Sequence, residues 1–393
     1  EEKILGVIKD ELHEVVEKFG TPRRTQICGR EARDLDVEDL IAEEDMVVTV
    51  THSGYIKRLP VDTYRSQKRG GKGVSALSLK ENDFVEGLFV ASTHDYVLFF
   101  TNFGKVYRLK VHELPVGSRQ ARGQAIVNLL ALSEGERLAA VITTREFPSE
   151  EYLLFATANG MVKKTAMSDY DRTRRDGMIA INLREGDELI DVRRVREHEK
   201  VILVSTDGKA IMFDESEARP MGRATSGVRG ITMKGDARLL GMEITNGSGD
   251  LFVITEKGYG KRTPVSEYPE HKRGGQGVFT ITMTDKKGEL AGMKVVAPQH
   301  ELMIVSEEGI VIRMKSGDIS RLGRSTQGVR VMNVADSDRV VAVARMEVNQ
   351  GQEDSDDANQ AALDLLAAGE KDPGDEAPVD IGGDEQVIDI DGE

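Results

Sequence analysis

The feature that most constrains the fold is a repeat of about 50 residues between positions 46 and 351. Six segments in this stretch consist of an apolar, β-favouring run, then Thr or Ser, then two residues and a glycine. Short β-rich runs that end on a turn glycine are typical of β-hairpins. The hairpin glycines are separated by 50, 56, 48, 50 and 51 residues and are Gly54, Gly104, Gly160, Gly208, Gly258 and Gly309.

A second series of glycines keeps the same period. Its members lie in turns that are often basic, and a third strand-like apolar run follows each turn. Two independent glycine series at one period leave little room for chance. These second glycines are separated by 50, 54, 50, 50 and 51 residues and are Gly73, Gly123, Gly177, Gly227, Gly277 and Gly328.

The size of the repeat predicts how the units are arranged. A unit with a few short strands cannot bury both faces of its own sheet. Six units arranged radially bury these faces on one another, and a closed ring leaves only short, protected edges. We therefore predict an all-β fold, a six-bladed, propeller-like closed disc over residues 46–351. A linear β-solenoid is the alternative, although its coils are usually shorter than this period.

The segments on both sides of the repeats have a different character. Apolar residues recur at spacings of three or four between Ile4 and Phe19, which predicts a short N-terminal helix. Residues 29–45 are acidic and are predicted to form a linker. Residues 352–393 carry 15 acids and one base, and we expect a disordered acidic tail there. Because Glu1 begins within the helical pattern, we expect the chain to be part of a longer protein.

The net charge of −15 is distributed unevenly. Residues 46–351 hold 45 bases and 39 acids, net +6, whereas the segments before and after them carry −7 and −14. A mildly basic body between acidic flanks suggests a polyanion as the partner of the body. We hypothesise that the tail competes with this polyanion. A tail that only improves solubility is the alternative.

Several other classes of protein are disfavoured. No apolar run is long enough to span a membrane, and no signal peptide is visible. Cys28 is the single cysteine, so an internal disulfide is impossible and we expect a reducing cytoplasm as the location. No spacing of a nucleophile, a general base or metal ligands stands out. We therefore expect neither catalytic residues nor a metal site in this chain.

Cations recur at fixed places in the repeats. Four residues after the hairpin glycine, five of the six repeats carry a cation, and Met212 is the exception. In a closed ring such cations form a basic belt, which suits the uniform phosphates of duplex DNA. Salt bridges between blades are the alternative. The candidate rim residues are Lys57, Arg58, Arg108, Lys163, Lys164, Lys261, Arg262 and Arg313 near this position, and Arg119, Arg122, Arg174, Arg175, Arg223, Arg229, Lys272, Arg273, Arg324 and Arg330 in the second turns.

The most basic turn is "QKRGGKG", residues 67–73. Because glycine has no side chain, a phosphate can approach its N–H closely, while neighbouring cations supply charge. The turn is not a P-loop, since the closing Lys-Ser/Thr is missing. It closely resembles the seven-residue box of the C-terminal domain of DNA gyrase A, and "HKRGGQG", residues 271–277, resembles an imperfect second copy. The box residues are Gln67, Lys68, Arg69, Gly70, Gly71, Lys72 and Gly73.

The helix, the six repeats and the acidic tail match this family in order. The resemblance implies a β-pinwheel, a propeller variant whose blades exchange a strand with a neighbour, and a box that helps to close the ring and lock wrapped DNA. Residues 1–28 would then end the helical region of a catalytic core. Duplex DNA would be bent into a positive crossing, and ATP-dependent strand passage by the rest of the enzyme would introduce negative supercoils.

The same resemblance implies the partners and cofactors. These are duplex DNA, the rest of DNA gyrase A as a dimer, and DNA gyrase B in an A2B2 heterotetramer in the bacterial cytoplasm, associated with the nucleoid. ATP and Mg²⁺ would act elsewhere in the enzyme, and we expect no cofactor in this chain. Topoisomerase IV, whose box tends to be degenerate, is one alternative. A protein-interaction propeller is another, but it predicts more exposed aromatic residues than an aromatic content of 5% provides.

Overall fold

The computed structural model divides the chain into two units, residues 1–42 and 43–393, which are described separately. The first contains helix α1 (Glu2–Phe19), where the sequence predicted a helix, and the 3₁₀ helix η1 (Val37–Leu40). The apolar side chains of α1 are exposed. Among the described residues, no helix is long and apolar enough to cross a membrane. The structure describes residues 2–21, 37–51, 53–61, 85–118, 121–173, 176–308 and 310–346.

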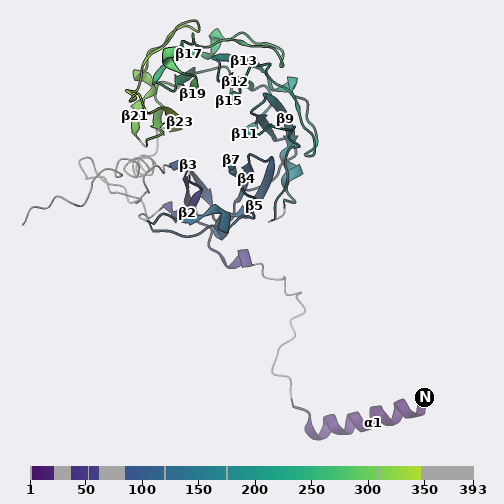
Figure 1. Cartoon of the computed structure of the whole chain (residues 1–393). Coiled ribbons are helices and arrows are strands. Elements are labelled where there is room, and N and C mark those ends of the chain that lie inside the picture. The colour runs from purple at the N-terminus through teal and green to yellow at the C-terminus, as the bar shows by residue number, and fades with distance from the viewer. Residues whose placement is uncertain are drawn as a thin grey trace, which may run out of the picture. The chain divides into compact units, whose positions relative to one another are not determined.

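The second unit consists of six small antiparallel sheets arranged around a ring (Figure 1). Five sheets have four strands, and the sixth has three among the described residues. The predicted all-β, six-bladed architecture is therefore confirmed. Blade 1 contains β1 (Asp45–Thr51), β2 (Tyr55–Pro60), β3 (Val85–Ser92) and β6 (Gln124–Ala125); blade 2, β4 (Tyr96–Thr101), β5 (Lys105–Lys110), β7 (Leu138–Thr144) and β10 (Met178–Ile179); blade 3, β8 (Tyr152–Thr157), β9 (Met161–Ala166), β11 (Leu189–Val195) and β14 (Val228–Arg229).

The remaining blades repeat this pattern, and short 3₁₀ turns connect the strands. Blade 4 contains β12 (Lys200–Ser205), β13 (Lys209–Asp214), β15 (Leu239–Thr245) and β18 (Val278–Phe279); blade 5, β16 (Asp250–Thr255), β17 (Tyr259–Pro264), β19 (Leu290–Val296) and β22 (Val329–Arg330); blade 6, β20 (Glu301–Ser306), β21 (Val311–Lys315) and β23 (Val340–Met346). The 3₁₀ turns are η3 (Val111–Glu113), η4 (Ile126–Asn128), η5 (Met167–Tyr170), η6 (Glu215–Glu217), η7 (Val265–Glu267), η8 (Asp285–Lys287) and η9 (Ser316–Asp318).

The outermost strand of each four-stranded blade comes from the following repeat. In blade 1, β6 pairs with β2 through Tyr55↔Ala125 and Ile56↔Gln124. In the same way β10, β14, β18 and β22 pair with β5, β9, β13 and β17. This is the strand exchange that the family resemblance implied. Each exchanged strand is the perimeter edge of its blade and also ties that blade to the next repeat.

The hydrophobic core lies between the blades, on both faces of each sheet. Phe99 packs in the cluster shared by blades 1 and 2, whereas Phe100, the next residue on β4, packs in the cluster shared with blade 3. There the Phe100 and Phe155 rings meet edge to face, with centroids 5.5 Å apart. Full burial of such a side chain contributes roughly 1.5–3 kcal/mol. Because both faces are interior, a side chain on a central strand is buried whichever way it points.

Glycine is required in both turn series. The hairpin glycines that the structure describes have positive φ, as at Gly208 with φ 83°. The described glycines of the second series also have positive φ, and the chain passes close to the preceding repeat there. At Gly277, with φ 69°, an added Cβ would lie 2.4 Å from the Ala210 carbonyl oxygen. Only glycine fits such a contact without moving the backbone.

Candidate nucleic-acid interface

Four of the five cations found four residues after the hairpin glycine lie at the junctions between blades. Each of these four reaches from the second strand of its blade to the 3₁₀ turn of the next repeat. Arg58 donates from Nε to the Leu114 carbonyl oxygen at 2.7 Å and from Nη2 to that of His112 at 2.9 Å. Arg262 bonds the Ile319 and Gly317 carbonyls, both at 3.0 Å, and pairs with Asp250 at 3.0 Å. Thus the guanidinium groups bind the protein itself.

Of the other members of this set, Lys164 and Arg108 reach the next repeat in the same way, whereas Arg313 does not. The Lys164 ammonium forms a buried ion pair with Glu215 of η6. Arg108 donates to the Asp171 carbonyl oxygen at the end of η5, and its guanidinium lies 4.7 Å from the Tyr96 ring centre. Arg313 is at the surface, and its Nε pairs with Glu301 of its own sheet at 2.7 Å.

Blade 4 is the exception in sequence, and the structure explains it. Met212 belongs to an apolar cluster that includes Val265, the first residue of η7. The cation has moved to the adjacent strand, where Lys200 lies 2.8 Å from Asp214 and 2.9 Å from Glu270 of the next repeat. An ionic contact between repeats is therefore present at this junction as well, at a different position.

Three lysines that precede these cations are fully buried. Lys57 donates to the Ala121 carbonyl oxygen at 2.9 Å, and Lys261 donates to those of Gly323 and Arg324 at 2.6 and 2.7 Å. Lys163 bonds the carbonyls of Ala180 and Arg223. Burial lowers the pKa of Lys57 and Lys261 to about 8. Burial, aided by the charge of Arg223, lowers the pKa of Lys163 to about 7.

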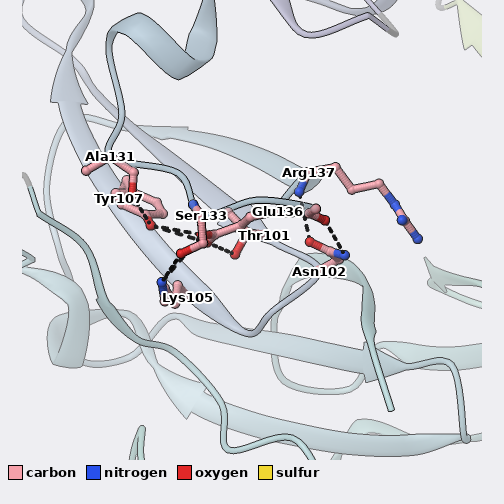
Figure 2. A network of polar contacts seen from close by, with 9 residues as sticks. Thr101, Asn102, Lys105, Tyr107, Ala131, Ser133, Glu136 and Arg137 are labelled. Atoms are coloured by element: carbon pink, nitrogen blue, oxygen red, sulfur yellow. Dashed lines mark hydrogen bonds and ion pairs between the residues drawn. The ribbon is translucent and has the colours of Figure 1, made fainter. Parts of the chain in front are cut away.

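Blade 2 has Tyr107 where these lysines stand, and it joins a buried polar network (Figure 2). Glu136 accepts hydrogen bonds from the Tyr107 hydroxyl at 3.2 Å, the Thr101 hydroxyl at 2.7 Å and the Ser133 N–H at 2.9 Å. Burial raises the pKa of the Glu136 carboxyl, but these hydrogen bonds and Lys105 outweigh it and leave the pKa below its ordinary value. The network holds the turn before β7 against the β4–β5 hairpin.

These positions correct part of the predicted rim. The expectation that every cation near the hairpin glycine presents its charge at an exposed rim is wrong, because blades pack face to face and both sides of the second strand are interior. The alternative, salt bridges between blades, describes Lys164 with Glu215 and Arg108 with Asp171. Arg58 and Arg262 reach the next repeat through hydrogen bonds to backbone carbonyls instead. The buried members are Lys57, Lys163, Lys164, Lys261 and Arg262; Arg58 and Arg108 are half-buried and bonded to backbone carbonyls.

The second turns, by contrast, place cations at or near the surface, within the turns themselves and, for Arg229 and Arg330, on the exchanged strands. Arg229, Lys272 and Arg330 are exposed, and the others are half-buried. Tyrosines support several of these cations: the Arg122 guanidinium lies 3.7 Å from the Tyr55 ring centre. Arg330 donates from Nη2 to the Tyr259 hydroxyl at 2.8 Å. The described members are Arg122, Arg223, Arg229, Lys272, Arg273, Arg324 and Arg330.

Hydrogen bonds join the second turns of repeats 3 to 6 into one continuous band. The Asn182 N–H donates to the Thr225 carbonyl oxygen at 3.1 Å. The Thr232 hydroxyl donates to that of Gly274 at 2.7 Å. The Thr282 hydroxyl donates to that of Ser325 at 2.7 Å. Each bond runs from the segment after one exchanged strand to the second turn of the next repeat. The surface cations of these repeats therefore lie on a connected strip of backbone, which we call the second-turn band.

Comparison with known proteins identifies the family. The family described as DNA gyrase C-terminal domain, beta-propeller, matches residues 45–92, 95–145, 151–196, 199–246, 249–297 and 300–345. The chain belongs to this family. DNA gyrase A of Mycolicibacterium smegmatis is 47% identical over 346 residues, which cover 88% of this chain and 41% of that protein. DNA gyrase A of Staphylococcus aureus (strain MRSA252) is 42% identical over 367 residues, covering 93% and 41%.

Solved structures agree with the gyrase C-terminal domain assignment. A topoisomerase IV C-terminal domain superposes with a TM-score of 0.70 at 28% identity, covering 84% of this chain and 98% of that one. A DNA gyrase A C-terminal domain gives 0.62 at 28% identity, covering 77% and 100%. The chain spans about two fifths of the length of the gyrase A proteins that it matches.

The segment predicted to be a gyrase box, residues 67–73, lies outside the described residues, as do Arg119, Arg174 and Arg175. The second copy, residues 271–277, is part of the second-turn band. Its Arg273 donates from Nε to the Glu217 carbonyl oxygen at 2.8 Å, and the Gly274 N–H donates to that of Gly230 at 2.6 Å. Lys272 is exposed.

One regularity within the second turns shows when the repeats are aligned on the hairpin glycine. Each of the six repeats carries an arginine 15 residues after that glycine. Counted from the second glycine, the spacing is four residues in five repeats, and in the third repeat it is two. These arginines are Arg69, Arg119, Arg175, Arg223, Arg273 and Arg324.

Proposed function

We propose that this chain binds duplex DNA without regard to sequence and bends it along the second-turn band. One observation carries the proposal: exposed and half-exposed cations of successive repeats lie on a strip of backbone that hydrogen bonds make continuous. Phosphates of a curved duplex form a matching row of negative charge. Contacts to phosphates fix the position of the duplex but carry no sequence information.

The expected energies are consistent with such a band. Bending a site of 20–30 base pairs by 40–90° costs on the order of 1–6 kcal/mol, so contacts from several blades are needed. If the six described cations of this band each neutralise one phosphate, affinity falls by roughly 10³–10⁵ between 50 and 200 mM salt. A steep salt dependence with little preference for base sequence is the expected signature.

We further propose that bending is chiral and serves DNA gyrase. Family membership supports a positive wrap that presents one DNA segment for strand passage, with the box locking the wrapped duplex. In that scheme the rest of gyrase A and its partner gyrase B supply DNA cleavage, ATP and Mg²⁺ in an A2B2 enzyme of the bacterial cytoplasm. This chain binds and shapes the DNA and needs no cofactor.

A topology assay tests the proposal. Relaxed plasmid is bound to the chain, treated with a nicking-closing enzyme and stripped of protein, and the linking number is measured. Trapped positive writhe is the expected result. Unchanged linking number with intact binding would favour the positioning role proposed for a topoisomerase IV domain, and absence of binding would reject both.

Matched variants locate the contact surface. Arg229→Gln with Arg330→Gln removes two charges from the band, whereas Arg137→Gln with Arg339→Gln removes two exposed charges from the turns before β7 and β23. The first pair should lower the slope of log affinity against log salt by about 2, and the second should leave it unchanged. Equal effects would mean that only net charge matters.

A further inference from the structure

A cross-strand pair recurs at one register of the perimeter in all five four-stranded blades. It joins the residue after the hairpin glycine to the second residue of the exchanged strand. In blade 1 the pair is Tyr55↔Ala125, without a cation, whereas in blades 2 to 5 one partner is a cation and the other is apolar or aromatic. The pairs are Lys105↔Ile179, Met161↔Arg229, Lys209↔Phe279 and Tyr259↔Arg330 in blades 2 to 5.

The outward member of the pair alternates in chemistry around the band. Arg229 and Arg330 are exposed in blades 3 and 5. Ile179 and Phe279 occupy the same place in blades 2 and 4, with exposed fractions of 51% and 59%. A single exposed apolar residue needs no explanation, but two at equivalent sites that alternate with two arginines form a pattern. The pattern places apolar side chains on the surface that carries the charge.

A cation lies beside each of the two apolar residues. The Lys209 ammonium lies 5.8 Å from the Phe279 ring centre. Arg223, from the next repeat, donates from Nη1 to the backbone carbonyl oxygen of Ile179 at 3.3 Å. A ligand that covers Ile179 and Phe279 must therefore offer an apolar surface to these side chains and negative charge to the neighbouring cations. Duplex DNA does so, because phosphates border a minor groove lined by sugars and base edges.

Resting on the proposed function, we propose that Ile179 and Phe279 press into the minor groove of the bent duplex. Apolar side chains inserted at base steps partly unstack them and kink DNA, which lets the duplex follow a curved protein surface. Arginines enter minor grooves that are narrow. Each time the minor groove of the curved duplex faces the protein, it would thus meet one of these positions. An apolar residue would bend the DNA at one position, and an arginine would supply charge at the next.

The test replaces both side chains, Ile179→Ala with Phe279→Ala, in the 393-residue chain. Trapped writhe and energy transfer between labelled ends of a linear duplex should fall, and affinity should weaken roughly tenfold through the lost apolar burial. The salt slope should stay at the wild-type value because no cation is removed. Fluorescence of 2-aminopurine in the DNA should rise on binding to wild type and stay low with the variant.

The controls separate this inference from the function on which it rests. Phe103→Ala removes an exposed phenylalanine from the β4–β5 turn and should behave as wild type, and Phe279→Leu should retain most of the bending. Wild-type bending and 2-aminopurine fluorescence in the double alanine variant would overturn the inference while leaving DNA binding intact. Failure of the wild-type chain to bind or wrap DNA would instead refute the proposed function. Unchanged thermal unfolding verifies that the variants are folded.

Discussion

The junction between blades 3 and 4 offers a strong test of the corrected role of the repeated cations. Lys164 and Glu215 form an ion pair there, and each side chain is only 6% exposed. At the next junction the equivalent positions hold Met212 and Val265, which share an apolar cluster. The chain therefore contains two solutions to one packing problem, and Lys164→Met with Glu215→Val converts the ionic one into the apolar one.

The expected magnitudes follow from burial. Removing one partner of a buried pair leaves an uncompensated charge and costs about 3–5 kcal/mol, whereas replacing both with packed apolar residues is often neutral or better. We expect each single substitution to lower the free energy of unfolding by about 3 kcal/mol, and the double substitution to lie within about 1 kcal/mol of wild type. The loss should be smaller for Glu215→Val, because the Lys164 ammonium also lies 4.5 Å from the Tyr152 ring centre.

Urea unfolding of the four proteins, followed by circular dichroism at pH 7, gives the coupling energy from the double-mutant cycle. A large favourable coupling is expected. DNA affinity and salt slope of the double variant should match wild type, since Lys164 faces the protein. If the losses of stability from the two single substitutions simply add, the ionic and apolar pairs are not interchangeable. A lower salt slope in the double variant would show that Lys164 contacts DNA after all.

Four further predictions concern the lysines, the box and the glycines of the repeats. Between pH 7 and 10 an unfolded chain holds the Lys163 proton more tightly than the folded one, so stability rises with pH; Lys163→Met should flatten this rise by up to about 1.4 kcal/mol per pH unit in urea unfolding. Replacing Lys68, Arg69 and Lys72 with Gln should reduce trapped writhe more than affinity, and equal losses would argue against a locking role for the box. Gly277→Ala should cost at least about 1–3 kcal/mol of stability. Gly275→Ala, whose Cβ would lie 3.4 Å from Ile211, should fold normally and weaken DNA binding if a phosphate approaches that backbone.

The repeat architecture could be predicted because its signals are physical requirements at single positions. Gly208 and Gly277 stand where the backbone has positive φ, so their period marks the turns of successive blades. The exchange of strands between repeats could not be predicted from the residues in this way. β18 is only two residues long and pairs with Lys209 and Ala210 of the preceding repeat. No local pattern in two residues specifies so distant a partner, and only the family resemblance implied it.

The candidate site was predicted less well, because recurrence alone does not distinguish a binding role from a structural one. Arg262 recurs in the repeats as a DNA contact would, yet it bonds Asp250 and two carbonyls inside a junction. One signal was present in the sequence. In four repeats, an acidic or aromatic residue stands twelve positions before the cation. This spacing predicts that the two side chains meet across neighbouring strands. These partners are Tyr96, Tyr152, Asp250 and Glu301.

Interior and surface cations are nevertheless connected through the backbone. Lys163 and Lys261 bond the carbonyl oxygens of Arg223 and Arg324, the arginines of the second turns. Loss of such a lysine should shift the turn that carries the surface charge, and DNA affinity should fall without any lost phosphate contact. The salt slope separates the two cases, because it counts the phosphates that are neutralised and not the precision with which the cations are held. A substitution that lowers affinity at constant slope therefore marks a residue that positions the second-turn band, and one that lowers both marks a residue that touches DNA.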